Sequence, residues 1–190
     1  HSYAENKIVE NLNLRVNEGE LIGICGASGC GKSTLLRLLM TIETPRAGEI
    51  YLGGELAASG NTGIRKSENT RNGFVMPIFQ DAFASLDARW PIWRTITEPL
   101  TAKRCGRRSS KNQMIVVAGE KLREVGLSEL NPNARPGELS VGQCQRVAIA
   151  RALAADAKFI AADEPTSSLD VISGERIMRL FADTAEKGAA

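Results

Sequence analysis

The sequence contains no apolar run near the roughly 18 residues that a membrane-spanning helix requires, and no signal peptide is recognisable. It also lacks an excess of charge of one sign, because 24 basic and 22 acidic residues give a formal net charge of +2. A balance this close gives no electrostatic footprint for nucleic acid or for an anionic membrane. We therefore expect a domain that reaches any membrane through a partner and makes no direct contact with nucleic acid.

No two cysteines form a CxxC pair, and His1 is the only histidine. The four cysteines are Cys25, Cys30, Cys105 and Cys144. This pattern argues against a zinc site or a disulfide framework and favours reduced thiols without a special role in a cytosolic enzyme. The chain starts without a methionine and stops at Ala190 directly after helix-like sequence, so we expect a piece of a longer protein.

The first part of the chain combines two strand-like segments with one helical segment. Residues 8–16 alternate apolar and polar side chains, which predicts a half-buried strand. Residues 21–25 are apolar without alternation, which predicts a strand covered on both faces, as in a parallel sheet. A helical stripe of leucines then extends to Ile42 and ends before Pro45.

Two further strands are predicted before the helical part of the chain, and one more after it. Residues 49–52 read as a strand, and the polar residues 60–72 as a surface loop. Residues 74–79 are strand-like, although Pro77 favours an edge or irregular strand. The last strand signal covers residues 158–162.

Between these strand signals, residues 81–136 are mainly helical in pattern. One helical face contains Ile115, Ala118, Leu122 and Val125. Gly126 follows at the position of a C-terminal cap. The pattern predicts an α/β core over residues 1–80 and 137–190, interrupted by a helical subdomain over residues 81–136.

A glycine-rich segment between the predicted strand and helix matches the pattern G-x-x-x-x-G-K-[ST] at every fixed position. It comprises Gly26, Ala27, Ser28, Gly29, Cys30, Gly31, Lys32, Ser33 and Thr34. The glycines let backbone N–H groups turn toward phosphate oxygens, and the following helix adds its positive N-terminal dipole. Lys32 would reach the β- and γ-phosphates, and the Ser33 hydroxyl would ligate Mg²⁺. The segment predicts binding of ATP with Mg²⁺.

Two acidic residues, Asp163 and Glu164, directly follow the last predicted strand. Ligands of open α/β sheets bind at the carboxyl ends of the strands. One carboxylate there can hold Mg²⁺, directly or through water, while the other takes the proton from an attacking water. Paired with the phosphate loop, this segment predicts the second half of a nucleotide site.

Residues 139–143 precede an alanine-rich helix and have two physical interpretations. Ser140 and Gln143 form an S-x-x-Q capping box that would start the helix. The same helix N-terminus, with Gly142 beside it, is also suited to binding a phosphate. The residues alone leave both interpretations open.

Residues 139–146 (LSVGQCQR) resemble the signature motif of ABC-type ATPases, LSGGQ-x-QR. Gln80 is similar to the Q-loop glutamine of that family, and residues 168–170 to its D-loop. Tyr3 lies where the family places an aromatic ring that stacks on adenine. The ordered motifs extend over essentially the whole chain.

The resemblance implies a P-loop NTPase fold, with a RecA-like core and a β-rich N-terminal part. Two ATPase domains of the family, identical or different, meet head to tail, and each closes the other's site. In cis, phosphates and Mg²⁺ would be held by Lys32, Ser33, Gln80 and Asp163. The γ-phosphate bound by the opposite domain would be contacted by Ser140, Gly142 and Gln143. Glu164 would act as the general base for the attacking water.

The sequence departs from the family pattern at three places. Val141 replaces the first glycine of the signature pair, and Ala82 stands where many importers have proline. The switch histidine of the family is missing, because it normally lies about 30 residues beyond the D-loop aspartate and only 20 residues follow Asp170. We expect truncation to account for the missing histidine.

Residues 77–81, 84–87 and 98–100 are similar to the ATPase subunits of bacterial dipeptide, oligopeptide and nickel importers. The resemblance implies an ATP hydrolase that powers such an importer from the cytoplasmic face of the inner or plasma membrane. It would bind transmembrane permease subunits, with Glu98 and Pro99 near the groove that receives a coupling helix.

Two other functions remain open at this point. An ABC-type ATPase acting on DNA is disfavoured, because Gln80 and Leu139 are 59 residues apart without heptads of a coiled coil. An ATPase acting on ribosomes would carry a second tandem domain, which this chain cannot test. The second alternative is a module that binds nucleotide without hydrolysing it. The presence of Glu164 argues against this alternative, whereas the missing histidine leaves it open.

Overall fold

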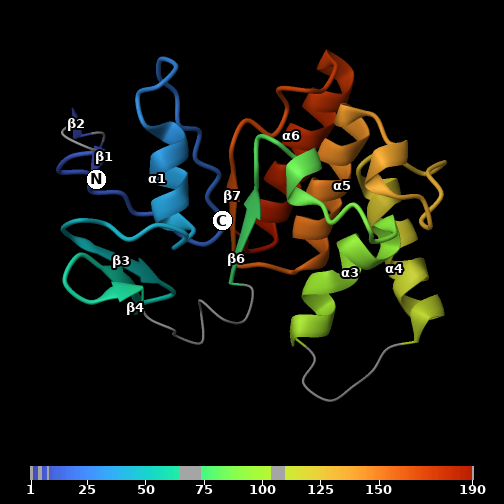
Figure 1. The fold of residues 1–190 in the computed structure, drawn as a ribbon, viewed down its shortest axis with the longest axis horizontal. Coiled ribbons are helices and arrows are strands. Elements are labelled where there is room, and N and C mark those ends of the chain that lie inside the picture. Colours follow the sequence, from blue (N-terminus) through green and yellow to red (C-terminus); the bar gives the residue numbers. More distant parts are fainter. Residues whose placement is uncertain (1, 4–5, 8, 65–73, 104–109, 190) are drawn as a thin grey trace.

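The computed structural model describes residues 2–3, 6–7, 9–64, 74–103 and 110–189, and shows small sheets beside a group of helices (Figure 1). Strands β1 (Ser2–Tyr3) and β2 (Asn6–Lys7) pair antiparallel. A three-stranded antiparallel sheet contains β3 (Glu49–Leu52), β4 (Glu55–Ser59) and β5 (Gly63–Ile64). The third sheet is the parallel pair β6 (Val75–Ile78) and β7 (Phe159–Ala162). The predicted strands at 49–52, 74–79 and 158–162 are thus confirmed.

The parallel pair joins the two ends of the helical part of the chain. Val75 lies opposite Phe159 and Ile78 opposite Ala162, so both strands end at the same edge of the sheet. Among the described residues β6 pairs only with β7, which makes it an edge strand, as Pro77 indicates.

The helices lie mainly in the second half of the chain. They are α1 (Lys32–Leu39), the 3₁₀ helix η1 (Phe83–Ser85), α3 (Ile92–Lys103), α4 (Lys111–Glu124), the 3₁₀ helix η2 (Pro136–Glu138), α5 (Val141–Ala154) and α6 (Val171–Glu186). Helices α3, α4 and α5 pack against one another, and their buried side chains share one cluster with Ile78 of β6 and Ile177 of α6. Because this cluster crosses the predicted boundary at residue 136, the division into core and subdomain stays a prediction.

Helix α4 shows how the local sequence sets an element. It begins at a capping box in which Gln113 N donates to Ser110 Oγ at 3.3 Å and Ser110 N to Gln113 Oε1 at 2.9 Å. It buries Ala118 and Leu122, as its helical face predicts. It ends at Gly126, whose φ of 74° lies in the left-handed region that favours glycine.

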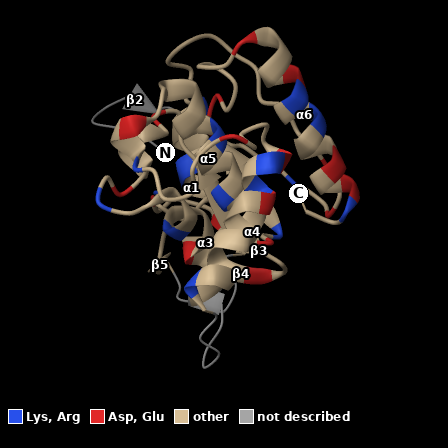
Figure 2. Cartoon of the chain, turned by 90° about the vertical axis from the view of Figure 1, so that its right-hand side faces the viewer, with Lys and Arg blue, Asp and Glu red and all other residues tan. Residues whose placement is uncertain are grey.

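The surface charges of the helices are mixed in sign. In Figure 2 acidic and basic residues are interspersed along α6. One exposed pair on this helix joins Arg179 Nη2 to Glu175 Oε1 at 2.7 Å. Within the described ranges, none of the helices has both the length and the apolar content needed to span a bilayer.

The predictions of strands at residues 8–16 and 21–25 are wrong. From residue 9 onward, no strand is present before β3. A strand needs a neighbour for its N–H and C=O groups, and no described strand pairs with residues 21–25. Leu21, Ile22 and Ile24 are consequently 54%, 43% and 38% exposed.

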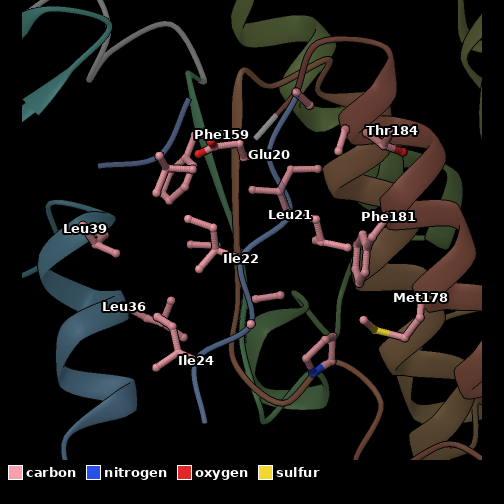
Figure 3. A pocket seen from close by; sticks show the side chains of 18 of the residues that line it. Glu20, Leu21, Ile22, Ile24, Leu36, Leu39, Phe159, Met178, Phe181 and Thr184 are labelled. Atoms are coloured by element: carbon pink, nitrogen blue, oxygen red, sulfur yellow. The ribbon is translucent and has the colours of Figure 1, made fainter. Parts of the chain in front are cut away.

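A cavity of about 270 Å³ lies between residues 21–24, α1, β7 and α6. Figure 3 shows Ile22 and Ile24 turned toward α1, and Leu21 toward Phe181 of α6. The apolar side chains of this segment therefore line the cavity, although the backbone of the segment pairs with no strand.

Candidate nucleotide site

The phosphate loop leads directly into helix α1. Gly31 is the N-cap of α1 with φ 104°, a left-handed value that a side chain would strain. Because glycine offers no side chain to cap the helix, the first-turn amides remain available to an anion. Ser33 and Thr34 lie in this first turn, so the loop supplies amides and hydroxyls at one place.

Lys32 folds back over the phosphate loop. Its Nζ donates hydrogen bonds to Gly26 O at 2.8 Å and Ala27 O at 2.9 Å, and it lies 4.0 Å from Cys30 Sγ. A Cβ added at Gly26 would lie 2.7 Å from Cys30 Sγ, so a side chain there would require the Cys30 thiol to move. The loop is therefore a compact cradle with its cation already in place, which fits the phosphates of a nucleotide.

Asp163 and Glu164 lie at the carboxyl end of β7, as predicted. Asp163 N donates to Ile78 O at 2.9 Å and extends the pairing of β6 and β7 by one step. Helix α1 lies against β7, and Lys32 lines the same cavity as β7. The hydroxyl of Ser33 and the carboxylate of Asp163 are hard oxygen donors of the kind that Mg²⁺ prefers.

Gln80 and Glu164 meet at this edge. Gln80 Nε2 donates a hydrogen bond to Glu164 Oε2 at 2.9 Å. Glu164 has φ 48°, a left-handed value that is rare outside glycine. Ser167 holds this turn, donating from N and Oγ to Glu164 O at 3.1 and 3.0 Å. Strained backbone of this kind clusters at functional sites.

The segment 139–143 starts helix α5, and both bonds of the predicted capping box are present. Gln143 N donates to Ser140 Oγ at 3.2 Å, and Ser140 N donates to Gln143 Oε1 at 2.8 Å. Val141 is 65% exposed, so its extra bulk lies at the surface. The capping interpretation is confirmed, and contact with a phosphate stays a prediction.

Two contacts around this helix were not predicted. A Cβ added at Gly142 would lie 3.2 Å from Ser168 O, so the first turn of α5 lies close against residues 168–169 of the same chain. Arg151 Nη1 donates to Ser85 O at 3.0 Å across 66 positions of the sequence. No local pattern in the sequence singles out either contact, because α5 also contains a second arginine, Arg146.

Asp170 is the N-cap of α6. Its Oδ1 accepts a hydrogen bond from Ser173 N at 2.9 Å. The backbone and side-chain hydrogen bonds from Ser173 lower the pKa of the Asp170 carboxyl. Tyr3, the predicted adenine contact, has its backbone in β1, and its side chain lies outside the described part of the chain.

A model of the ABC transporter family matches residues 9–167. The chain is 38% identical over 183 residues to the oligopeptide transport ATP-binding protein OppD of Mycobacterium tuberculosis, which covers 96% of this chain and 29% of OppD. It is 36% identical over 178 residues to the probable D,D-dipeptide transport ATP-binding protein DdpF of Escherichia coli, covering 94% of this chain and 52% of DdpF. It is 35% identical over 174 residues to the nickel import ATP-binding protein NikE of Escherichia coli, and this match covers 92% of this chain and 63% of NikE.

The chain thus spans between 29% and 63% of the length of these relatives. Among solved structures, it is similar to the ATP-binding cassette MJ0796, described as a dimer in a post-hydrolysis state bound to ADP and Pi. The TM-score is 0.83 at 34% identity, over 98% of this chain and 79% of that one. A likeness of this extent establishes the P-loop fold that the sequence predicts.

Proposed function

Because the chain belongs to the ABC transporter family, we propose that it binds ATP with Mg²⁺ and hydrolyses the ATP to power import of peptides or nickel. The observation that supports hydrolysis most directly is the Gln80–Glu164 hydrogen bond, 2.9 Å long, at the carboxyl end of the parallel pair. It presents a carboxylate beside Asp163, just after the end of β7, the strand that α1 contacts.

In this proposal the residues of one chain bind and orient ATP. The amides of residues 26–31 and the Lys32 ammonium would hold the β- and γ-phosphates, and the Tyr3 ring would stack on adenine. Ser33, Gln80 and Asp163 would hold Mg²⁺, which supplies charge neutralisation at the phosphate oxygens. Glu164 would take the proton from the water that attacks the γ-phosphate, with its carboxylate oriented by Gln80.

A second ATPase domain would complete each site. Ser140, which is exposed, and the half-buried Gly142 and Gln143 lie at the start of α5, where their polar groups and the helix N-terminus would face the γ-phosphate of the opposite chain. The dimer described for MJ0796 supports a pairing of this kind. Hydrolysis would then depend on association of the two domains, because the stabilising groups converge only in the dimer.

Transmembrane permease subunits are the proposed further partners, which would hold the chain at the cytoplasmic face of the membrane. The names of the three relatives, for transport of oligopeptides, D,D-dipeptides and nickel, support this assignment. Glu98 is exposed on α3, as a contact with a permease helix requires.

The test is uptake of labelled substrate by a strain that lacks the chromosomal copy and carries the full-length protein on a plasmid. A di- or oligopeptide or ⁶³Ni²⁺ should accumulate with the unaltered protein and not with Glu164→Gln. The control Glu175→Gln alters an exposed residue of α6 and should leave uptake unchanged. Equal uptake with Glu164→Gln would contradict an ATP-driven role.

A further inference from the structure

Arg151, in the last turn of α5, reaches out of its helix to the short helix that follows Gln80. Its Nη1 donates a hydrogen bond at 3.0 Å to the carbonyl oxygen of Ser85, the last residue of η1. Helix α5 also packs against η1 and against β6, the strand from which Gln80 emerges. The guanidinium therefore joins the helix that starts at Ser140 to the segment that presents Gln80.

The position of this guanidinium is unfavourable for stability alone. Burial lowers the pKa of Arg151, and the Glu98 carboxylate offsets this only in part. Its Nε is buried and has no hydrogen-bond partner among the described residues. An apolar side chain of similar length would avoid the cost of removing a charge from water. A charged residue at this point therefore calls for a role beyond packing.

The short helix η1 is built as a preformed turn between Arg151 and Gln80. Ala84 N donates to Asp81 Oδ1 at 2.9 Å, and Ser85 Oγ donates to Ala82 O at 2.7 Å. Ala82 and Leu86, on either side of η1, are buried. The internal bonds of η1 are short-range, and the bond from Arg151 links this short helix to α5.

We infer that Arg151 is a positioning residue: by holding the Ser85 carbonyl it fixes residues 81–85 against α5 and keeps the Gln80 amide within reach of Glu164. A tilt of α5 would be transmitted along the same contacts to Gln80. Arg151 touches neither nucleotide nor Mg²⁺ in this scheme. The kinetic consequence rests on the proposed function, whereas the hold on η1 does not.

The hold is tested by amide hydrogen exchange on the full-length protein. The reporters are the amides of Ala84, Ser85 and Leu86, whose hydrogen bonds define η1. Arg151→Met should speed their exchange by a factor of about ten or more, the lower bound for losing one hydrogen bond from a charged donor. The control Arg179→Met removes an exposed arginine of α6 and should leave these amides unchanged. Unchanged exchange in Arg151→Met overturns the inference.

The kinetic consequence separates positioning from loss of structure. Arg151→Met should lower kcat for ATP and leave its KM unchanged, and Arg151→Lys, which keeps a donor, should recover part of the loss. In a Gln80→Ala background, Arg151→Met should cause no further loss of kcat. Additive losses overturn the inference, because Arg151 would then act independently of Gln80.

If Arg151→Met does not fold, kcat of Arg151→Lys in the wild-type and Gln80→Ala backgrounds decides the same question. A wild-type protein without ATPase activity would contradict the proposed function, while the exchange experiment would still test the hold.

Discussion

Gln80 Nε2 lies 2.9 Å from Glu164 Oε2, which joins two residues 84 positions apart in the sequence. The parallel pairing of β6 with β7 causes this meeting, because both strands end at one edge and each of the two residues lies two positions after the end of its strand. In this hydrogen bond the Gln80 amide donates and the Glu164 carboxylate accepts.

Glu164→Gln should stop ATP turnover and leave ATP binding intact. An amide cannot take the proton of an attacking water, but its oxygen can still accept the hydrogen bond from Gln80. Loss of a general base typically lowers the rate by about 10²–10⁴-fold. Phosphate release and binding of a fluorescent ATP analogue measure the two properties separately. Unchanged turnover would refute the assignment of the base.

Lys32→Ala should abolish productive nucleotide binding. The substitution removes the cation that would meet the β- and γ-phosphates, and with it the two hydrogen bonds that Nζ donates to Gly26 O and Ala27 O. Titration with a fluorescent ATP analogue measures the effect. Lys121→Ala is the matched control, because Lys121 lies on α4 in an exposed pair with Glu124. Equal affinity of Lys32→Ala and the wild type would count against the phosphate loop as the binding site.

Gly142→Ala should lower ATP turnover without lowering thermal stability. The added Cβ would lie 3.2 Å from Ser168 O and push the 168–170 segment, while alanine favours the helix by about 1 kcal/mol over glycine. Val141→Gly is the comparison, since Val141 is 65% exposed and its side chain can be removed with little effect on turnover. Turnover assays and thermal melts of both variants check this. Turnover of Gly142→Ala equal to that of the wild type would show that the contact with Ser168 is unimportant.

The elements that the sequence predicts correctly depend on local physics. The capping box at Ser140, the glycine that ends α4 at Gly126 and the strand β7 follow from residues within a few positions of one another. The strand predicted at residues 21–25 failed because a strand also needs a paired neighbour, which an apolar run does not reveal.

The same reasoning separates the candidate site into predictable and unpredictable parts. The phosphate loop and Asp163–Glu164 are contiguous motifs, so residue types and spacing suffice to identify them as candidate site residues. The contacts Gly142–Ser168 and Arg151–Ser85 join distant parts of the chain through tertiary packing, so no local pattern signals them.

Asp170 should stabilise α6 in a manner that depends on pH. The hydrogen bonds from Ser173 place the pKa of the folded Asp170 below its ordinary value of 3.8. A carboxyl with a lowered folded pKa contributes its full stability above the unfolded value, and loses it as pH falls through the folded one. The difference in melting temperature between the wild type and Asp170→Ala should therefore be constant between about pH 5 and 7 and narrow below pH 3.8. Thermal melts at pH 3 to 7 measure it, with Asp183→Ala, an exposed residue later in α6, as the control. Protonation removes the charge that strengthens the hydrogen bond from Ser173. A difference in melting temperature that grows on acidification would therefore contradict a stabilising role of Asp170 as the N-cap of α6.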